Sequence, residues 1–254
     1  MLKKSARAEK VKAEAKVQSG SGPRSTSALT STSTSLDLDL SLSRSAILLA
    51  STSPRRRELL ALLGIPFDVR SPSFEERLVP GRTAIQQVMS FAQGKAQSVA
   101  KQEPEAIVLG SDTVIELDHD VLGKPADLAE ARAMLRRLAG RDHHVRTAVA
   151  LVCSARAIDI VALSTAVVRM KPFDERVHER YLATGESLGK AGAYSIQGEG
   201  GDLVDSIDGD FTTVVGLPLR LVAQLLTQAG MRVPVDLGEL YASKPYANWA
   251  LFPG

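Results

Sequence analysis

The spacing of hydrophobic residues predicts alternating strands and helices from residue 46 onward. AILLAS (46–51) is a short, uninterrupted apolar run, which is typical of a strand buried on both faces. Ser53 and Pro54 then provide an N-cap and a first-turn proline for an amphipathic helix that ends at Gly64. The same spacing rules predict further strands at 65–72, 106–117, 145–152 and 160–170, and further helices at 84–102, 127–140, 173–185 and 217–230.

Punctuating residues refine this pattern. Gly94 interrupts the periodicity of the helix at 84–102, and Asp127 with Glu130 forms a variant of the capping box at the start of the helix at 127–140. LVDSIDGDFTTVVG (203–216) has the pattern of a hairpin around Asp208-Gly209. Because hairpins and crossover connections both occur, we expect an α/β fold with a mixed sheet.

The N-terminal segment differs in composition from the rest of the chain. Residues 19–45 contain 14 Ser or Thr among 27 residues, and 1–18 are highly charged. Such a segment buries too little apolar surface to offset its ordering entropy, so we predict a disordered tail over 1–45. A domain at 46–233 and a C-terminal extension at 234–254, for which the sequence suggests no role, follow it. The tail is basic and Ser-rich like a mitochondrial presequence, but it contains Glu9 and Glu14, so we expect a cytoplasmic protein.

The charge of the chain gives no general case for nucleic acid binding. Residues 1–46 hold eight basic and four acidic side chains, whereas the remainder holds 23 basic and 25 acidic ones. A nearly neutral domain is not expected to bind a nucleic acid polymer, so any cationic site must be local. The single Cys153 excludes an internal disulfide, and no apolar run of about 18 residues predicts a membrane span.

Three consecutive arginines stand at the predicted start of the first helix. A helix N-terminus carries about half a positive charge, so Arg55, Arg56 and Arg57 oppose the helix dipole there. An anion would reverse the sign of this interaction, because backbone N–H groups, hydroxyls and guanidinium groups all donate to phosphate oxygens. We therefore predict phosphate binding by Arg55 and Arg56, and we interpret Arg57 as a solvated surface charge.

A second cluster combines GSDTV (110–114) with LGKP (122–125). The strand at 106–117 should present the carboxylate of Asp112 at one edge of the sheet, where it could hold a divalent cation or accept a proton from water. An isolated aspartate at such a place is more often a local cap, and an isolated turn lysine such as Lys124 is more often simply exposed. Together they favour a metal-and-phosphate site.

A third stretch, KAGAYSIQGEGG (190–201), is rich in glycine and other small residues. Small residues let a backbone approach a ligand closely, and the Gln197 amide offers the donor and acceptor that reading a base edge requires. Glycine-rich loops without any ligand are common, so this stretch alone is weak evidence.

In order, these motifs resemble the Maf family of nucleoside triphosphate pyrophosphatases. The resemblance covers about residues 47–226 and rests on ASTSPRRRELL, the EE pair at 75–76, GSDTV, LGKP, LRRLAGRDHHVRTAV, KAGAYSIQG and DGDFTTVVGLPL. It implies an ITPase-like (Maf/Ham1) fold with an elongated mixed sheet, a central nucleotide cleft and commonly a homodimer. It also implies hydrolysis of the α–β phosphoanhydride to a nucleoside monophosphate and pyrophosphate with Mg²⁺ or Mn²⁺. The AYSIQG form resembles the branch that acts on dTTP and UTP, with modified pyrimidine nucleotides an open alternative.

The resemblance also assigns roles to individual residues. Asp112 matches the catalytic proton acceptor, and Asp112 with Glu76 matches acidic positions near the metal. The phosphate-binding positions correspond to Ser51, Arg55, Arg56, Lys95 and Lys124, and the positions associated with substrate choice to Arg55, Thr113 and Gln197. The chain departs from the family pattern at Ser187, Gly189 and Asp202-Leu203. These departures lie beside the base-reading loop, so they bear on pyrimidine preference more than on catalysis.

Two other functions fit part of the pattern. LDHDVL (117–122) suggests the DxD motif of a haloacid-dehalogenase-like phosphatase, but that motif needs Thr or Val where Leu122 stands, and the stretch is more simply a hairpin turn. A non-catalytic nucleotide-binding regulator of cell division is the other alternative. The intact set of Asp112, Lys124, Arg55 and Arg56 argues against it.

Overall fold

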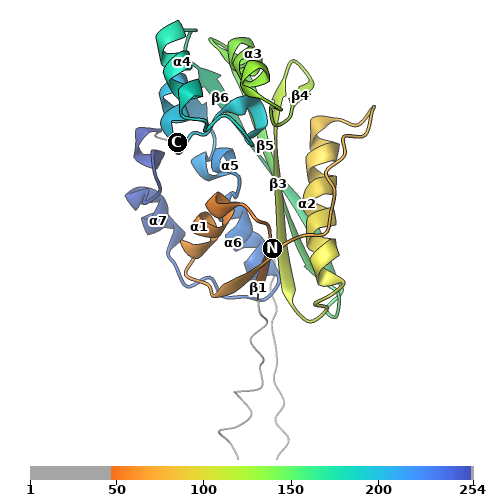
Figure 1. The fold of residues 1–254 in the computed structure, drawn as a ribbon. Coiled ribbons are helices and arrows are strands. Elements are labelled where there is room, and N and C mark those ends of the chain that lie inside the picture. The colour runs from red at the N-terminus through yellow and green to blue at the C-terminus, as the bar shows by residue number, and fades with distance from the viewer. Residues whose placement is uncertain (1–46, 253–254) are drawn as a thin grey trace, which may run out of the picture. The chain divides into compact units, whose positions relative to one another are not determined.

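A computed structural model describes residues 47–252, and the predicted disordered tail lies outside these residues. The fold is α/β, with a seven-stranded mixed sheet in the order β2-β1-β3-β5-β6-β7, and β4 pairs with β3 (Figure 1). Strand β1 runs parallel to β2 and β3, and the other pairs are antiparallel. The strands are β1 (Ile47–Ala50), β2 (Phe67–Arg70), β3 (Ile107–Leu117), β4 (Asp120–Leu122), β5 (Asp142–Cys153), β6 (Ile158–Met170) and β7 (Val204–Asp208). The expected mixed α/β architecture is confirmed.

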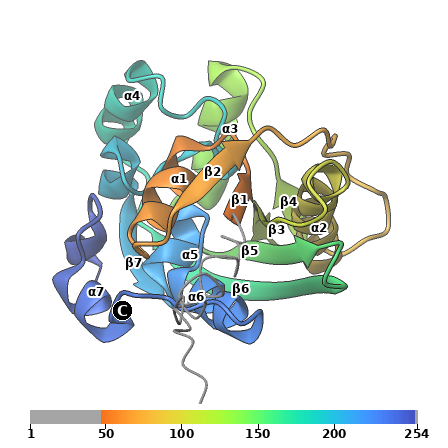
Figure 2. The same ribbon diagram turned by 90° about the horizontal axis from the view of Figure 1, so that it is seen from below.

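Helices cover both faces of this sheet. Along β1, Ile47 and Leu49 pack into one hydrophobic cluster, while Leu48 and Ala50 pack into another on the opposite face, as alternating side chains of a strand must. Helix α2 covers the second cluster and lies on the other side of the strands from α1 and α7 (Figures 1 and 2). The helices are α1 (Pro54–Ala61), α2 (Ala84–Ala100), α3 (Leu128–Leu138), α4 (Glu175–Ala183), α5 (Phe211–Val215), α6 (Leu219–Gln228) and α7 (Leu237–Ser243), with short 3₁₀ turns η1 (Ala191–Ala193), η2 (Glu199–Leu203) and η3 (Trp249–Leu251). Among residues 47–252, no helix is both long and apolar enough to cross a membrane.

The capping and glycine signals predicted for α1, α2 and α3 agree with the structure, with small differences. Pro54 does occupy the first turn of α1, but the Ser53 side chain makes no capping hydrogen bond. Helix α2 runs unbroken through Gly94. A Cβ at this position would lie 2.2 Å from the Phe74 ring, so the glycine makes room for that ring. In α3, Asp127 caps the Glu130 N–H while the Glu130 carboxylate accepts from the N–H of Ala126. The capping-box variant is therefore confirmed.

The hairpin predicted over residues 203–216 is wrong in its second half. Residues 204–208 form β7, but 211–215 form helix α5. Asp210 caps this helix by accepting from the Thr212 N–H at 2.8 Å, and Gly216 ends it with φ 119°. All five residues of α5 are buried, so tertiary packing and two terminal signals overcome the strand propensity of Thr and Val.

Close packing between α2 and β3 brings two charged side chains together. A Cβ at Gly110 on β3 would lie 2.3 Å from the Ala92 carbonyl oxygen on α2. Only glycine permits this approach of helix and strand. The approach brings Lys95, one turn further along α2, to Asp112, two residues further along β3.

Candidate active site

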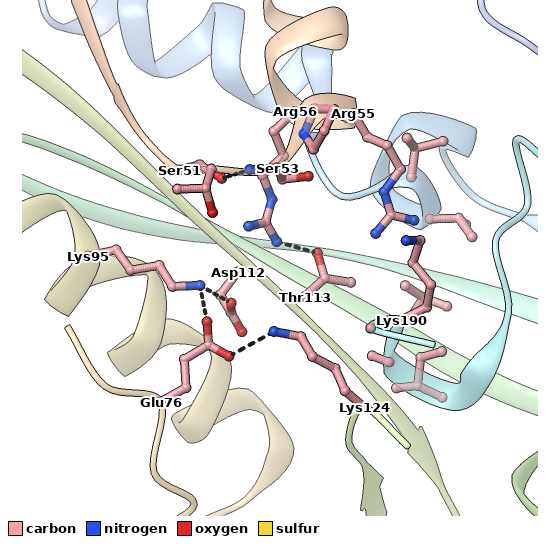
Figure 3. A pocket seen from close by; sticks show the side chains of 18 of the residues that line it. Ser51, Ser53, Arg55, Arg56, Glu76, Lys95, Asp112, Thr113, Lys124 and Lys190 are labelled. Atoms are coloured by element: carbon pink, nitrogen blue, oxygen red, sulfur yellow. Dashed lines mark hydrogen bonds and ion pairs between the residues drawn. The ribbon is translucent and has the colours of Figure 1, made fainter. Parts of the chain in front are cut away.

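A cavity of about 650 Å³ lies at the carboxyl end of β1 and along β3. Five cationic side chains line it against two carboxylates, Glu76 and Asp112. Figure 3 shows the carboxylates of Glu76 and Asp112 meeting at the Lys95 ammonium, and the Arg56 guanidinium reaching Thr113. The cations are Arg55, Arg56, Lys95, Lys124 and Lys190. This excess of positive charge suits a ligand with several negative charges.

The first turn of α1 presents the two arginines in different directions. The Arg56 side chain is fixed by the fold, since its Nε donates to the Gly216 carbonyl at 2.9 Å and its Nη2 donates to Thr113 Oγ1 at 3.2 Å. Arg55 extends away from Asp112, toward Lys190 (Figure 3). Arg57 is exposed and does not line the cavity, as its interpretation as a surface charge predicted.

The electrostatics of the arginines favour an anion in the cavity. Burial, followed by the neighbouring charge of Arg56, lowers the pKa of Arg55. Burial also lowers the pKa of Arg56, although the nearby carboxylates of Asp112 and Glu76 oppose this. Guanidinium groups stay protonated even when they lose water, so their burial costs free energy. A bound anion would offset this cost by pairing with their positive charge.

Lys95 joins the two carboxylates of the site. Its Nζ lies 2.5 Å from Glu76 Oε1 and 2.5 Å from Asp112 Oδ1, and the Lys95 residue is only 6% exposed. Burial raises the pKa of Asp112 above its ordinary value, against the lowering effect of Lys95 and Arg56. Burial also acts to raise the pKa of Glu76, but the hydrogen bond and charge of Lys95, with Lys124 and Arg56, outweigh it and lower that pKa. The two acids therefore differ, and Asp112 is the better proton acceptor.

The opposite end of the cavity is formed by residues 189–197. Gln197 lines it, and its Oε1 is buried without a hydrogen-bond partner among the described residues. Lys190 also lines it, and burial followed by the charges of Arg55 and Lys124 lowers the pKa of Lys190. The structure thus brings the predicted phosphate-binding side chains and the predicted base-reading residue Gln197 to one cavity.

Lys190 is a site residue that the sequence analysis did not single out. It begins the KAGAYSIQG motif between Gly189 and Ala191, and a lysine between small residues in a loop was the only available signal. Thr113 was assigned to substrate choice, but it also links Arg56 to Thr147, whose hydroxyl lies 2.9 Å away. Ser51 is buried at the end of β1, and its Oγ accepts from the Ser53 N–H at 3.2 Å.

A buried histidine supports the wall of this cavity. His143 Nε2 lies 2.9 Å from the hydroxyl of Tyr194, a cavity-lining residue. Burial, with the nearby charge of His144, lowers the pKa of His143 from 6.5 to about 4. His143 is therefore neutral in the folded protein at neutral pH.

This lowered pKa predicts a loss of stability in mild acid. Above pH 6.5 the histidine is neutral in the folded and unfolded chains, whereas between 6.5 and 4 only the unfolded chain takes up the proton. We expect this one residue to remove about 2 kcal/mol of unfolding free energy between about pH 7.5 and pH 5. Urea unfolding of the wild type and His143→Gln at both pH values measures it, since glutamine can still bond Tyr194 but does not titrate. An equal acid loss in both proteins would contradict the prediction.

Together, the fold and the site define an α/β protein with a polyanion-binding cavity around a buried carboxylate. A sequence model of the Maf-like protein family matches residues 46–229, and the chain belongs to this family. It is 48% identical over 184 residues to the dTTP/UTP pyrophosphatase of Symbiobacterium thermophilum, covering 72% of this chain and 94% of that protein. It is 44% identical over 187 residues to the dTTP/UTP pyrophosphatase of Pelotomaculum thermopropionicum, covering 74% and 98%. The enzyme of that name from Clostridioides difficile is 42% identical over 180 residues, covering 71% and 93%.

Proposed function

We propose that this protein is a nucleoside triphosphate pyrophosphatase that hydrolyses dTTP and UTP to the monophosphate and pyrophosphate, and so serves nucleotide-pool maintenance. The observation that carries the proposal is the cavity lined by five cations and by the buried carboxylate of Asp112, with Gln197 among the lining residues. A triphosphate would supply the negative charge that balances these cations. A pyrimidine base would supply a hydrogen-bonding group for the Gln197 Oε1, which has no partner among the described residues. The names of the relatives support the same substrates.

In the proposed reaction, a water molecule attacks the α-phosphorus and the bond to the α–β bridging oxygen breaks. Asp112, whose pKa is raised by burial, accepts the proton of that water. Ser51, Arg55, Arg56, Lys95 and Lys124 hold the phosphates and offset the charge that develops on the leaving pyrophosphate. Arg55, Thr113 and Gln197 contribute to the choice of substrate.

Asp112 and Glu76 also suit a divalent cation. Their carboxylates converge on one position, now taken by Lys95 Nζ, at 2.5 Å each. Magnesium is often held by one or two carboxylates together with substrate phosphates. We propose that Asp112 and Glu76 hold Mg²⁺ or Mn²⁺, which when bound would neutralise phosphate charge and make water more acidic.

A nucleotide panel with Mg²⁺ or Mn²⁺ tests this function. We expect dTTP and UTP to yield pyrophosphate faster than dCTP, dATP or dGTP, and we expect label from ¹⁸O-water to enter the monophosphate, because attack is at the α-phosphorus. Release of orthophosphate would contradict the reaction. Saturable nucleotide binding without turnover would instead support a non-catalytic regulator.

A further inference from the structure

The C-terminal segment 234–252 lies beyond the part of the chain that the family model matches, yet it packs on the domain. Trp249 is only 2% exposed, and its ring stacks on Phe211 with centroids 5.7 Å apart. The Tyr246 hydroxyl donates to Glu58 Oε2 on α1 at 2.7 Å. The segment therefore contacts the helix that carries Arg55 and Arg56.

Asn248 connects the same segment to the loop that carries Gln197. Its Nδ2 donates to the carbonyl oxygens of Ile196 and Gly198, at 2.9 Å each, and these two residues flank Gln197. Both partners are acceptors, so the amide must present its nitrogen to them. The Asn248 backbone is left-handed, with φ 63°, which asparagine tolerates better than most residues. The neighbouring Trp249 anchors this conformation in the core.

The contact is tightly packed against a glycine-rich stretch of chain. A Cβ at Gly201 would lie 2.8 Å from Asn248 Nδ2, so glycine at 201 leaves the space that the asparagine fills. The stretch from Ile196 to Gly201 contains three glycines, including Gly201 itself, and their freedom in the unfolded chain makes ordering this stretch costly. A clamp on both carbonyls beside Gln197 removes this freedom before a ligand arrives.

We propose that Asn248 is a positioning residue for base recognition, because it fixes the Gln197 amide toward a uracil or thymine base. The inference rests on the proposed function, in which Gln197 reads the base. Hydrogen-bond discrimination between bases requires the reading group to be held in place, and here the holding group comes from the C-terminal segment. The two hydrogen bonds of Asn248 go to the backbone on either side of Gln197 and to none of the predicted phosphate-binding side chains.

Asn248→Gly in the full chain tests the inference. Glycine accepts the left-handed backbone, so the substitution removes both hydrogen bonds without adding strain. We expect the affinity for dTTP and UTP, measured by calorimetry with metal chelated, to fall about tenfold, while that for dGTP changes less than about twofold. In turnover, KM for dTTP should rise by a similar factor and kcat should change less than about threefold.

Asp236→Ala is the matched control. Asp236 lies in the same segment and its carboxylate also holds two backbone groups, the N–H of Gly238 and of Glu239, but it does not line the cavity. We expect this variant to keep the wild-type preference for dTTP over dGTP. An unchanged preference in Asn248→Gly, or the same change in both variants, would overturn the inference. Wild-type protein that binds with this preference but releases no pyrophosphate would refute the proposed reaction while leaving the clamp supported.

Discussion

Asp112→Asn should abolish nearly all pyrophosphate release from dTTP while leaving the fold intact. The asparagine amide has the same shape but cannot accept a proton from water, and positioned general bases contribute about 10²–10⁴-fold to rate. The fold should survive because Glu76 still pairs with Lys95 at 2.5 Å, and a neutral amide avoids the desolvation that raises the pKa of Asp112. Steady-state pyrophosphate release, with circular dichroism to verify folding, measures both expectations.

Asp118→Asn is the control for this prediction. Asp118 and Asp120 form the DxD that suggested a phosphatase with an aspartyl nucleophile, but Asp118 lies in the turn between β3 and β4, and Asp120 is the first residue of β4. Their carboxylates pair with Arg141 and Arg137, and neither lines the cavity. We therefore expect wild-type turnover in Asp118→Asn. Loss of activity there, with activity retained in Asp112→Asn, would reverse the assignment of the site.

The positions of most strands and helices along the chain were predictable because most elements carry their own signals. The hairpin turn at Asp118 and His119 was predicted and is confirmed by the pairing of β3 with β4, where both residues have positive φ. Helix α5 was not predictable from propensity, since its Thr and Val residues favour strands. This helix matters for the site because it ends at Gly216, whose carbonyl accepts hydrogen bonds from Arg56 Nε and from the Ser111 hydroxyl.

The site was predictable in its residue types but not in its connections. Motif order identified Arg56, Asp112 and Gln197, yet nothing local indicated that Lys95 would lie between Glu76 and Asp112, 17 residues along the chain from Asp112. The contact of Asn248 could not be predicted for the same reason, because its partner Ile196 is 52 residues away along the chain. Contacts of this kind depend on the packing of α2 on β3 and of the C-terminal segment on the domain. The homodimer, the cytoplasmic location and the metal stay predictions.

Arg56→Lys should lower kcat/KM for dTTP by about 10²–10³-fold, the range for removal of one fixed charge-stabilising donor. The guanidinium donates to Gly216 and to Thr113 through two of its nitrogens, which holds the remaining donors toward the cavity. A lysine ammonium is a point charge on a flexible stem and cannot reproduce this fixed fork. Steady-state pyrophosphate release from dTTP by Arg56→Lys measures the fall in kcat/KM, and a thermal unfolding curve separates this fall from a loss of folding.

Arg57→Lys, the neighbouring position, is the matched control for Arg56→Lys. Arg57 lies in the same helical turn and contributes the same formal charge, but its side chain is exposed and outside the cavity. We expect its kcat/KM to stay within about twofold of wild type, because lysine keeps the charge and the exposed Arg57 side chain lies outside the cavity. Because both substitutions keep the positive charge, equal losses at both positions would mean that the contacts holding the Arg56 guanidinium are not what turnover requires. A loss confined to Arg56 would mean that three arginines oppose the helix dipole for the sake of one or two fixed phosphate donors, with Arg57 as surface charge.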